Sequence, residues 1–171
     1  MFVLTIISCE NDLDHVTRVT VVDNTPDQIT NNLHTIYSDS GIVEYEIIAS
    51  RMEMFEKPVQ KTFFKNGFTV NYFSKAGNKI STLKANYAEI IENENLIVAK
   101  NNVIFTNYKK QQTLKTEELF WDQKLKKIRT TKNFFVDSPN TEAKGIGLIA
   151  DETFSEYTMN DFSLTYKDTT Q

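Results

Sequence analysis

The sequence predicts an all-β protein of the sandwich or barrel-like kind, and three observations support this prediction. The aromatic residues are mostly Phe and Tyr, 12 and 7 of them against a single Trp. Together with the many Thr, Ile and Val residues, they favour strands over helices. Turn-forming residues recur roughly every 8–12 residues along most of the chain. Between them, apolar and polar residues alternate, as in strands that bury one face.

The first residues contain a candidate lipid-attachment site. An apolar run over residues 2–7 is followed by Ser8 and Cys9, and the chain turns polar directly after the cysteine. This order resembles the end of a bacterial lipoprotein signal, in which a small residue precedes the acylated cysteine. We therefore expect residues 1–8 to be a signal remnant and Cys9 to carry acyl chains that hold the protein to a membrane. The run lacks the basic start and the length of a complete signal, so an apolar first strand with a buried cysteine is the alternative.

Residues 9–40 are rich in Asn, Asp and Thr, and we interpret them as a polar tether. Within the tether, apolar residues at positions 29, 33, 36 and 37 have the spacing of one face of a helix. This spacing predicts one short amphipathic helix over residues 27–37, which ends in the Ser, Asp and Gly residues at 38–41.

From Gly41 the apolar pattern changes to a period of two, which predicts a single β domain over residues 41–166. Pro58, Pro139 and a turn at residues 75–78 separate some of its strands. The expected strands cover residues 42–55, 68–73, 79–91, 96–100, 103–108, 112–122, 127–131, 134–136, 141–150, 154–159 and 162–166. Residues 167–171 are expected to form a polar tail.

Internal repeats predict how these strands are arranged. Similar segments begin at Leu83, Leu114 and Ala143, and an earlier copy begins at Ile48. Each unit reads as a hairpin with a short third segment, and a unit of about 30 residues is too small to bury its apolar face alone. Stacked units predict two facing antiparallel sheets with an apolar seam between them.

Several short motifs occur in a fixed order in the second half of the chain. They are Leu114-x-Thr116-x-x-Leu119-x-Trp121-Asp122, Ile128-x-Thr130, Gly145-x-Gly147-Leu148-x-Ala150 and Phe154-x-x-Tyr157. This series resembles the LptC family, the periplasmic component of the bacterial lipopolysaccharide-export ABC transporter. The preceding unit, from Leu83-x-Ala85-x-x-Ala88 to Val103-x-Phe105, is similar to the OstA-like repeats of the periplasmic bridge protein LptA. The resemblance covers residues 41–166.

The resemblance implies a twisted, β-jelly-roll-like pair of sheets with an open apolar groove. In the family, the groove accepts the acyl chains of lipid A, the membrane-embedded part of lipopolysaccharide. An edge strand pairs with the bridge protein, and an ATPase among the inner-membrane transporter subunits supplies the energy. The resemblance therefore implies a non-enzymatic transport component at the periplasmic face of the inner membrane. Known members carry an uncleaved transmembrane helix, whereas this chain offers Cys9.

Apolar residues of the repeats are the candidates for contact with lipid. They are Leu83, Ala85, Tyr87, Val98, Val103, Phe105, Leu114, Leu119, Trp121 and Ile128. Strict alternation places Leu114 on the face opposite Leu119 and Trp121, but one bulge reverses that order, so the face that lines the groove stays open. For Trp121 a place in the core is the alternative. Gly145 and Gly147 are expected to allow close sheet-to-sheet approach or a bulge.

No residue pattern predicts catalysis, a cofactor or a metal site. His15 and His34 lie in the polar N-terminal region, and the lone cysteine excludes an internal disulfide and paired-cysteine metal sites. A net charge of −4 with interspersed charges gives no footprint for nucleic acid. The alternative to transport is an exported structural or interaction lipoprotein that binds protein partners through its sheet edges without moving lipid.

Overall fold

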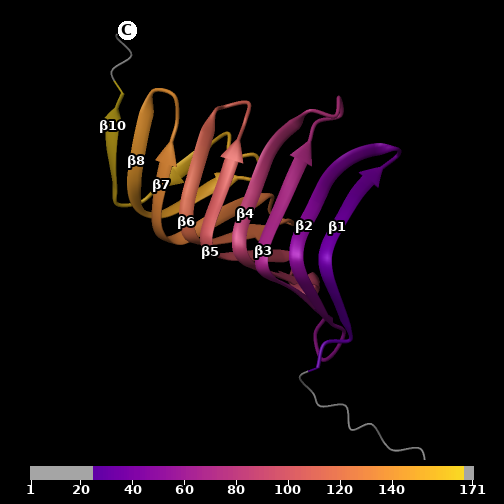
Figure 1. Ribbon diagram of the computed structural model, residues 1–171. Coiled ribbons are helices and arrows are strands. Elements are labelled where there is room, and N and C mark those ends of the chain that lie inside the picture. Colours follow the sequence, from indigo (N-terminus) through magenta and orange to yellow (C-terminus); the bar gives the residue numbers. More distant parts are fainter. Residues whose placement is uncertain (1–24, 168–171) are drawn as a thin grey trace, which may run out of the picture.

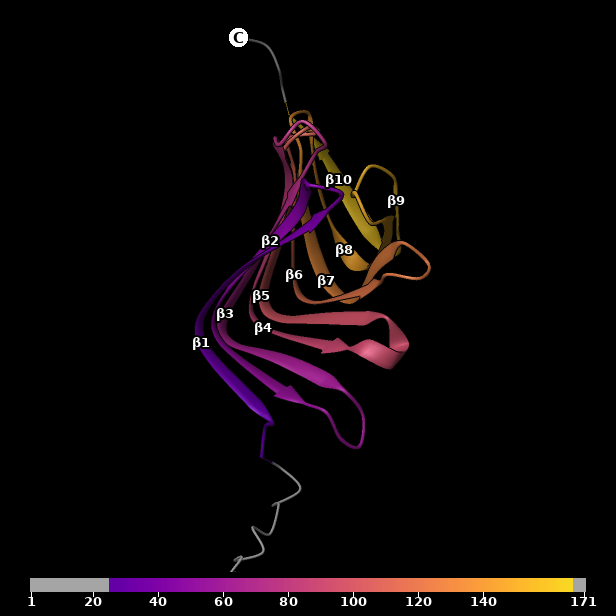
Figure 2. The ribbon, with the colours of Figure 1, turned by 90° about the vertical axis from the view of Figure 1, so that its right-hand side faces the viewer.

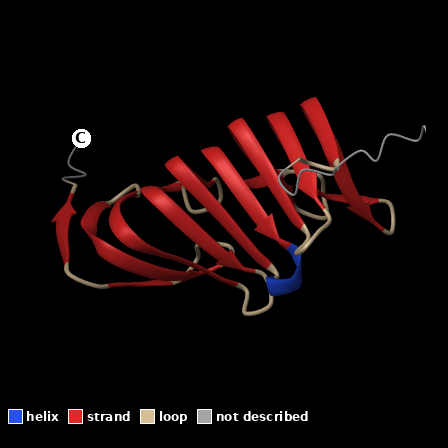
Figure 3. Cartoon of the chain, turned by 90° about the horizontal axis from the view of Figure 1, so that it is seen from below, coloured by secondary structure: helices blue, strands red, loops and turns tan. Residues whose placement is uncertain are grey.

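A computed structural model of the chain describes residues 25–167 and folds them into one antiparallel sheet (Figure 1). The strands are β1 (Gln28–Asp39), β2 (Ile42–Phe55), β3 (Lys61–Phe73), β4 (Lys79–Ile91), β5 (Leu96–Asn107), β6 (Gln112–Asp122), β7 (Lys127–Asp137), β8 (Thr141–Asp151), β9 (Tyr157–Met159) and β10 (Phe162–Tyr166). Strands β1 to β8 follow one another across the sheet, and both β9 and β10 pair with β8. A 3₁₀ turn, η2 (Glu92–Glu94), joins β4 to β5 beside the strands (Figure 3). The all-β class is confirmed.

The expected helix over residues 27–37 is wrong, because this segment is strand β1. It pairs with β2 from Gln28, opposite Met54, to Asp39, opposite Ile42, so the sheet begins well before Gly41. Asn and Thr are poor helix formers, and a long neighbouring strand offers backbone partners along the whole segment. The helix-like spacing arises because Asn32 has a positive φ of 53° and breaks the alternation within the strand.

The two layers expected from the repeats are the two halves of one continuous sheet. A line of bulges crosses it, with a register shift in every strand pair from β2–β3 to β7–β8. In β5, for example, Asn101 and Asn102 have positive φ values of 64° and 56°, which Asn tolerates better than most residues. Bulges bend strands and increase their twist, and Figure 2 shows each long strand curving from one layer into the other.

The internal repeats fall on alternate strands, at one level of the sheet. Leu83 lies opposite Phe105, Phe105 opposite Leu114, Leu114 opposite Val136, and Val136 opposite Ala143. All five side chains are buried. These residues therefore form a continuous apolar row from β4 to β8. Each repeat supplies one strand of this row, and the strand between two repeats supplies the residue that links them.

Phe154 fills the space between the layers at the β8–β9 end. Its side chain is fully buried, stacks on Tyr157 with ring centroids 5.0 Å apart, and meets the Phe105 ring edge-on at 6.0 Å. Asp151 shapes the loop that carries it, since its Oδ1 accepts hydrogen bonds from the backbone N–H groups of Ser155 and Glu156, both at 2.7 Å. Burial raises the pKa of Asp151, but these and the Thr153 hydrogen bonds outweigh burial and hold the pKa below its ordinary value.

Gly145 and Gly147 occupy the crowded part of β8. A Cβ on Gly145 would lie 2.7 Å from the carbonyl oxygen of Asp161 and 2.8 Å from the Phe134 ring, so only glycine fits without a shift of the backbone. Gly147 has a φ of +81°, which glycine adopts without a steric penalty.

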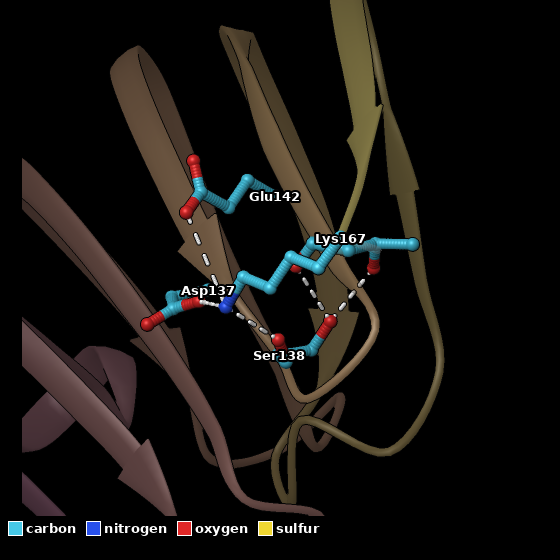
Figure 4. A network of polar contacts seen from close by, with 5 residues as sticks. Asp137, Ser138, Glu142 and Lys167 are labelled. Atoms are coloured by element: carbon cyan, nitrogen blue, oxygen red, sulfur yellow. Dashed lines mark hydrogen bonds and ion pairs between the residues drawn. The ribbon is translucent and has the colours of Figure 1, made fainter. Parts of the chain in front are cut away.

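The C-terminal end of the described chain is held by Lys167 (Figure 4). Its backbone N–H donates to the carbonyl of Asn140 at 2.9 Å, and its Nζ donates to the carbonyl of Ser138 at 2.9 Å. The same ammonium pairs with Asp137 and lies 4.0 Å from Glu142. These contacts fix the residue after β10 against the β7–β8 turn.

Candidate functional site

A groove of about 610 Å³ lies between the two layers of the bent sheet. Its interior is apolar and comes from facing rows of inward-pointing side chains. Among its lining residues are Tyr45, Tyr72, Leu83, Phe105, Leu119, Trp121 and Ile128. The bends in the sheet bring residues of both layers to one cavity. Strands β2 to β5 line it from one side of the line of bulges, and β6 and β7 line it from the other side.

Five of the ten residues expected to contact lipid line this groove: Leu83, Phe105, Leu119, Trp121 and Ile128. Ala85, Val103 and Leu114 belong to the buried core beside it. The remaining two, Tyr87 and Val98, alternate with the inward-facing Ala88 and Ala99 and so point to the outer face of the sheet. The Tyr87 ring lies there, 6.3 Å from the Phe63 ring between centroids.

Strict alternation along β6 is wrong, because the strand is irregular at its midpoint. The register with β7 shifts between Thr116 and Phe120, where β7 has one residue more, and across this shift Leu119 and Trp121 lie on the same side as Leu114. Leu114 and Leu119 are both buried in one core, and Trp121 packs against it. The irregularity thus lets both halves of β6 face the inner side of the sheet, where Leu114 packs in the core and Leu119 and Trp121 line the groove.

An aromatic series enters the groove from the β1 edge, and the sequence analysis missed most of it. Tyr37 stacks on Tyr45 at 4.7 Å, Tyr45 lies 6.2 Å from Tyr72, and Tyr72 meets Trp121 edge-on at 5.5 Å. Burial raises the pKa of Tyr45 and, more strongly, that of Tyr72, so both hydroxyls stay neutral. The sequence did carry a signal for this series, which was a tyrosine near one end of each of three neighbouring strands.

Trp121 also brings a polar group into the groove wall. Its indole Nε1–H is buried and has no hydrogen-bond partner among the described residues. A buried donor without a partner carries a desolvation cost. An oxygen of a bound ligand would relieve that cost if it reached Nε1.

The groove has a polar rim of mixed charge, which includes Glu44, Lys109 and Glu152. The Asn107 side chain connects the end of β5 to the loop after β8 at this rim, since its Nδ2 donates to the carbonyl of Thr153 at 2.6 Å. An apolar interior with a polar rim suits an amphiphile whose chains enter and whose head group stays outside.

Among the described residues, none pairs with the outer side of β1 or of β10, and both strands expose apolar side chains. On β1, Ile36 and Tyr37 are 56% and 49% exposed. On β10, Phe162 and Tyr166 are 50% and 78% exposed. Such edges are templates for an added strand from another chain.

Between residues 25 and 167, no three His, Cys, Asp or Glu side chains come together to hold a metal ion. His34 lies on β1, with its Nε2 2.6 Å from the carboxylate of Glu46. No helix in this part of the chain has the length and apolar character to cross a membrane. His15 and the candidate attachment site Cys9 lie outside the described residues.

Comparison with known protein families gives one match. The model of the LptC-related lipopolysaccharide-assembly family matches residues 1–161. The chain belongs to the LptC family. No curated protein sequence matches it significantly. Membership places the chain in lipopolysaccharide transport, at the periplasmic face of the envelope, with lipopolysaccharide and the other transport proteins as its partners.

Proposed function

We propose that this LptC-family protein is a non-enzymatic carrier that holds the acyl chains of lipid A in the groove between its layers. The apolar groove of about 610 Å³ is the observation that carries the proposal. Each methylene that moves from water into an apolar site gains about 0.8 kcal/mol, as it does in a bilayer. A groove lined by Leu119, Trp121 and Ile128 can therefore offset most of what the chains lose on leaving the membrane.

The lipid passes to a periplasmic bridge protein through strand pairing at a sheet edge. A bridge protein that adds a strand to β1 or β10 continues the sheet, and the two grooves then join end to end. The exposed Phe162 and Ile36 side chains would be covered by such a partner. The inner-membrane ABC transporter subunits supply the energy for transfer, since passive binding moves nothing in a fixed direction.

Acylation of Cys9 anchors the protein to the inner membrane. In this arrangement the segment between Cys9 and Gln28 is the tether, and the sheet begins where the tether ends. Mass spectrometry of the protein from membranes tests this part directly, because acylation adds the mass of the attached chains to a peptide that begins at Cys9.

The carrier function is tested by photo-crosslinking in cells, with a photoreactive phenylalanine at one position at a time. Tyr72 and Trp121 report on the groove, while Tyr87 and Ile149 on the outer face are the matched controls. We expect adducts with lipopolysaccharide from Tyr72 and Trp121 alone, and only while the transporter's ATPase works. Equal adducts from both faces, or none from the groove, would contradict the proposal.

The second candidate is an exported interaction lipoprotein, which the exposed apolar side chains of β1 and β10 favour. It uses the same edges to bind proteins and carries no lipid. Crosslinks from edge positions to protein, without any lipid adduct from Tyr72 or Trp121, would select this function.

A further inference from the structure

The lysines of the internal repeats have no role in the apolar seam. Lys84, Lys115 and Lys144 occupy the same position in the three repeats and follow the inward-facing Leu83, Leu114 and Ala143. Alternation turns all three lysines to the outer face. They lie on alternate strands at one level, with Ile104 and Phe135 directly between them. Successive lysines are therefore about 10 Å apart, at twice the spacing between strands.

Two of these lysines converge on one aromatic ring. The Nζ of Lys115 lies 5.9 Å from the centroid of the Phe135 ring, and the Nζ of Lys144 lies 5.5 Å from it. All three residues line a surface hollow of about 750 Å³, together with Phe162 and Ser163 of β10. The hollow thus combines two lysines and the Ser163 hydroxyl with aromatic rings, and the acidic residues Glu117 and Asp161 also line it.

Two carboxylates on the outer face near these lysines are paired with another cation. Asp137 and Glu142 lie two residues along the strands from Phe135 and Lys144, and Lys167 pairs with both of them (Figure 4). Glu117 also lines the hollow, where its carboxylate accepts the backbone N–H of Asn102 at 3.3 Å. Among the described residues, no carboxylate forms an ion pair with Lys115 or Lys144.

We propose that this hollow binds the phosphate of an anionic membrane lipid. Lys115 and Lys144 hold the phosphate as two point charges, the Ser163 hydroxyl donates a hydrogen bond, and Phe135 contacts the adjoining apolar part of the lipid. Lys84 extends the cationic row toward β4. The site lies on the face opposite the groove, so it stands or falls independently of lipopolysaccharide transport.

Vesicle flotation tests the site with the full chain, which carries Cys9→Ser in every sample so that acylation cannot contribute. The parent is expected to float with vesicles of phosphatidylcholine and phosphatidylglycerol, and not with phosphatidylcholine alone. Lys115→Gln with Lys144→Gln is expected to weaken binding about 30-fold. The matched control is Lys124→Gln with Lys127→Gln, which makes the same change in net charge on exposed residues and leaves binding within about twofold. Thermal unfolding of each variant verifies the fold.

The site would be overturned if both double variants lost vesicle binding equally, or if the parent bound vesicles with and without phosphatidylglycerol alike. Either result would leave no binding that is specific to the hollow. Inorganic phosphate is the arm that separates the two sources of phosphate. A parent that binds inorganic phosphate in calorimetry, with this binding lost in the Lys115→Gln and Lys144→Gln double variant, but that does not float with either vesicle assigns the hollow to free phosphate and overturns the assignment to lipid.

Discussion

The two ends of the sheet differ in how its layers are held together. At the N-terminal end no residue of β1 is buried, and the strand contacts the rest of the protein mainly through β2. At the other end β8 buries Ala143, Leu148 and Ala150, and the loop after it inserts Phe154 between the layers. The space between the layers therefore holds tyrosines toward β1 and a packed aromatic cluster toward β9.

This difference separates the part of the fold that maintains its shape from the part that can accept a partner. Packed aromatic clusters open only with global unfolding, whereas exposed edge strands open at low cost. Stability should thus depend strongly on residues near Phe154 and weakly on residues of β1. Substitutions at the two ends and in the middle of the sheet test this contrast, with the largest expected effect first.

The largest effect is expected from Phe154→Ala. The substitution removes a fully buried ring that contacts Phe105 and Tyr157, and such changes cost about 3–5 kcal/mol. For a domain of this size, the melting temperature should fall by roughly 10 °C. Differential scanning calorimetry measures the change.

Ile36→Ala is the matched control at the other end, since it also removes an apolar side chain but from a position that is 56% exposed on β1. It should change the free energy of unfolding by about 0.5 kcal/mol or less. Similar losses in the two variants would show that the ends do not differ as described.

An intermediate effect is expected from the buried carboxylate of Glu53. Hydrogen bonds from Lys65 at 2.6 Å and from Arg51 at 2.7 Å hold its pKa below the ordinary value. A lowered folded-state pKa stabilises the protein above the unfolded-state pKa, and this contribution is lost as the pH falls through the folded-state pKa. Glu53→Gln should therefore cost about 1–2 kcal/mol at neutral pH, and the gap from the parent should close in acid.

Urea unfolding at a series of pH values measures this gap. Glu94→Gln in the η2 turn, where no residue is buried, controls for the loss of one negative charge. A gap between parent and Glu53→Gln that stays constant from neutral to acid pH would contradict the assigned ion pairs.

The smallest global effect is expected from Lys167→Gln. The ion pairs of Lys167 are partly exposed to solvent, so their loss should cost about 1 kcal/mol or less. The local effect should be larger, because Lys167 holds the end of β10 to the β7–β8 turn. Hydrogen exchange of the β10 amides should speed up while β4 to β6 stay protected, and unchanged β10 exchange would refute the role of this lysine.

The sequence predicted the regular strands of the molecule better than the bulges within them. The all-β class, the repeats and the inward row from Leu83 to Ala143 follow from apolar periodicity, which reports burial directly. The positions of the bends do not follow from apolar periodicity, because a pair such as Asn101 and Asn102 is as typical of a turn between two strands as of a bulge within one strand. Trp121 and Leu114 were placed on opposite faces for the same reason.

Long-range packing was the other limit. Strand β1 is stabilised by pairing with β2, and its own composition gives no alternating pattern that would reveal this. Phe154 is buried through the loop that Asp151 shapes, and neither residue carries a periodic signal. The repeated lysines were visible in the sequence, yet their convergence on Phe135 depends on the register of three strands.

The most direct test of the central claim, that acyl chains occupy the groove, uses Trp121 as a reporter. It is the single tryptophan of the chain and lines the groove. Titration with a fatty acid brominated along its chain should quench its fluorescence saturably, since bromine quenches only at close contact, and lipopolysaccharide should reverse the quenching. A variant with Trp121→Phe and Ile149→Trp, which moves the reporter to the outer face, should not be quenched. Equal quenching at both positions, or none at Trp121 while the fatty acid binds, would contradict the account.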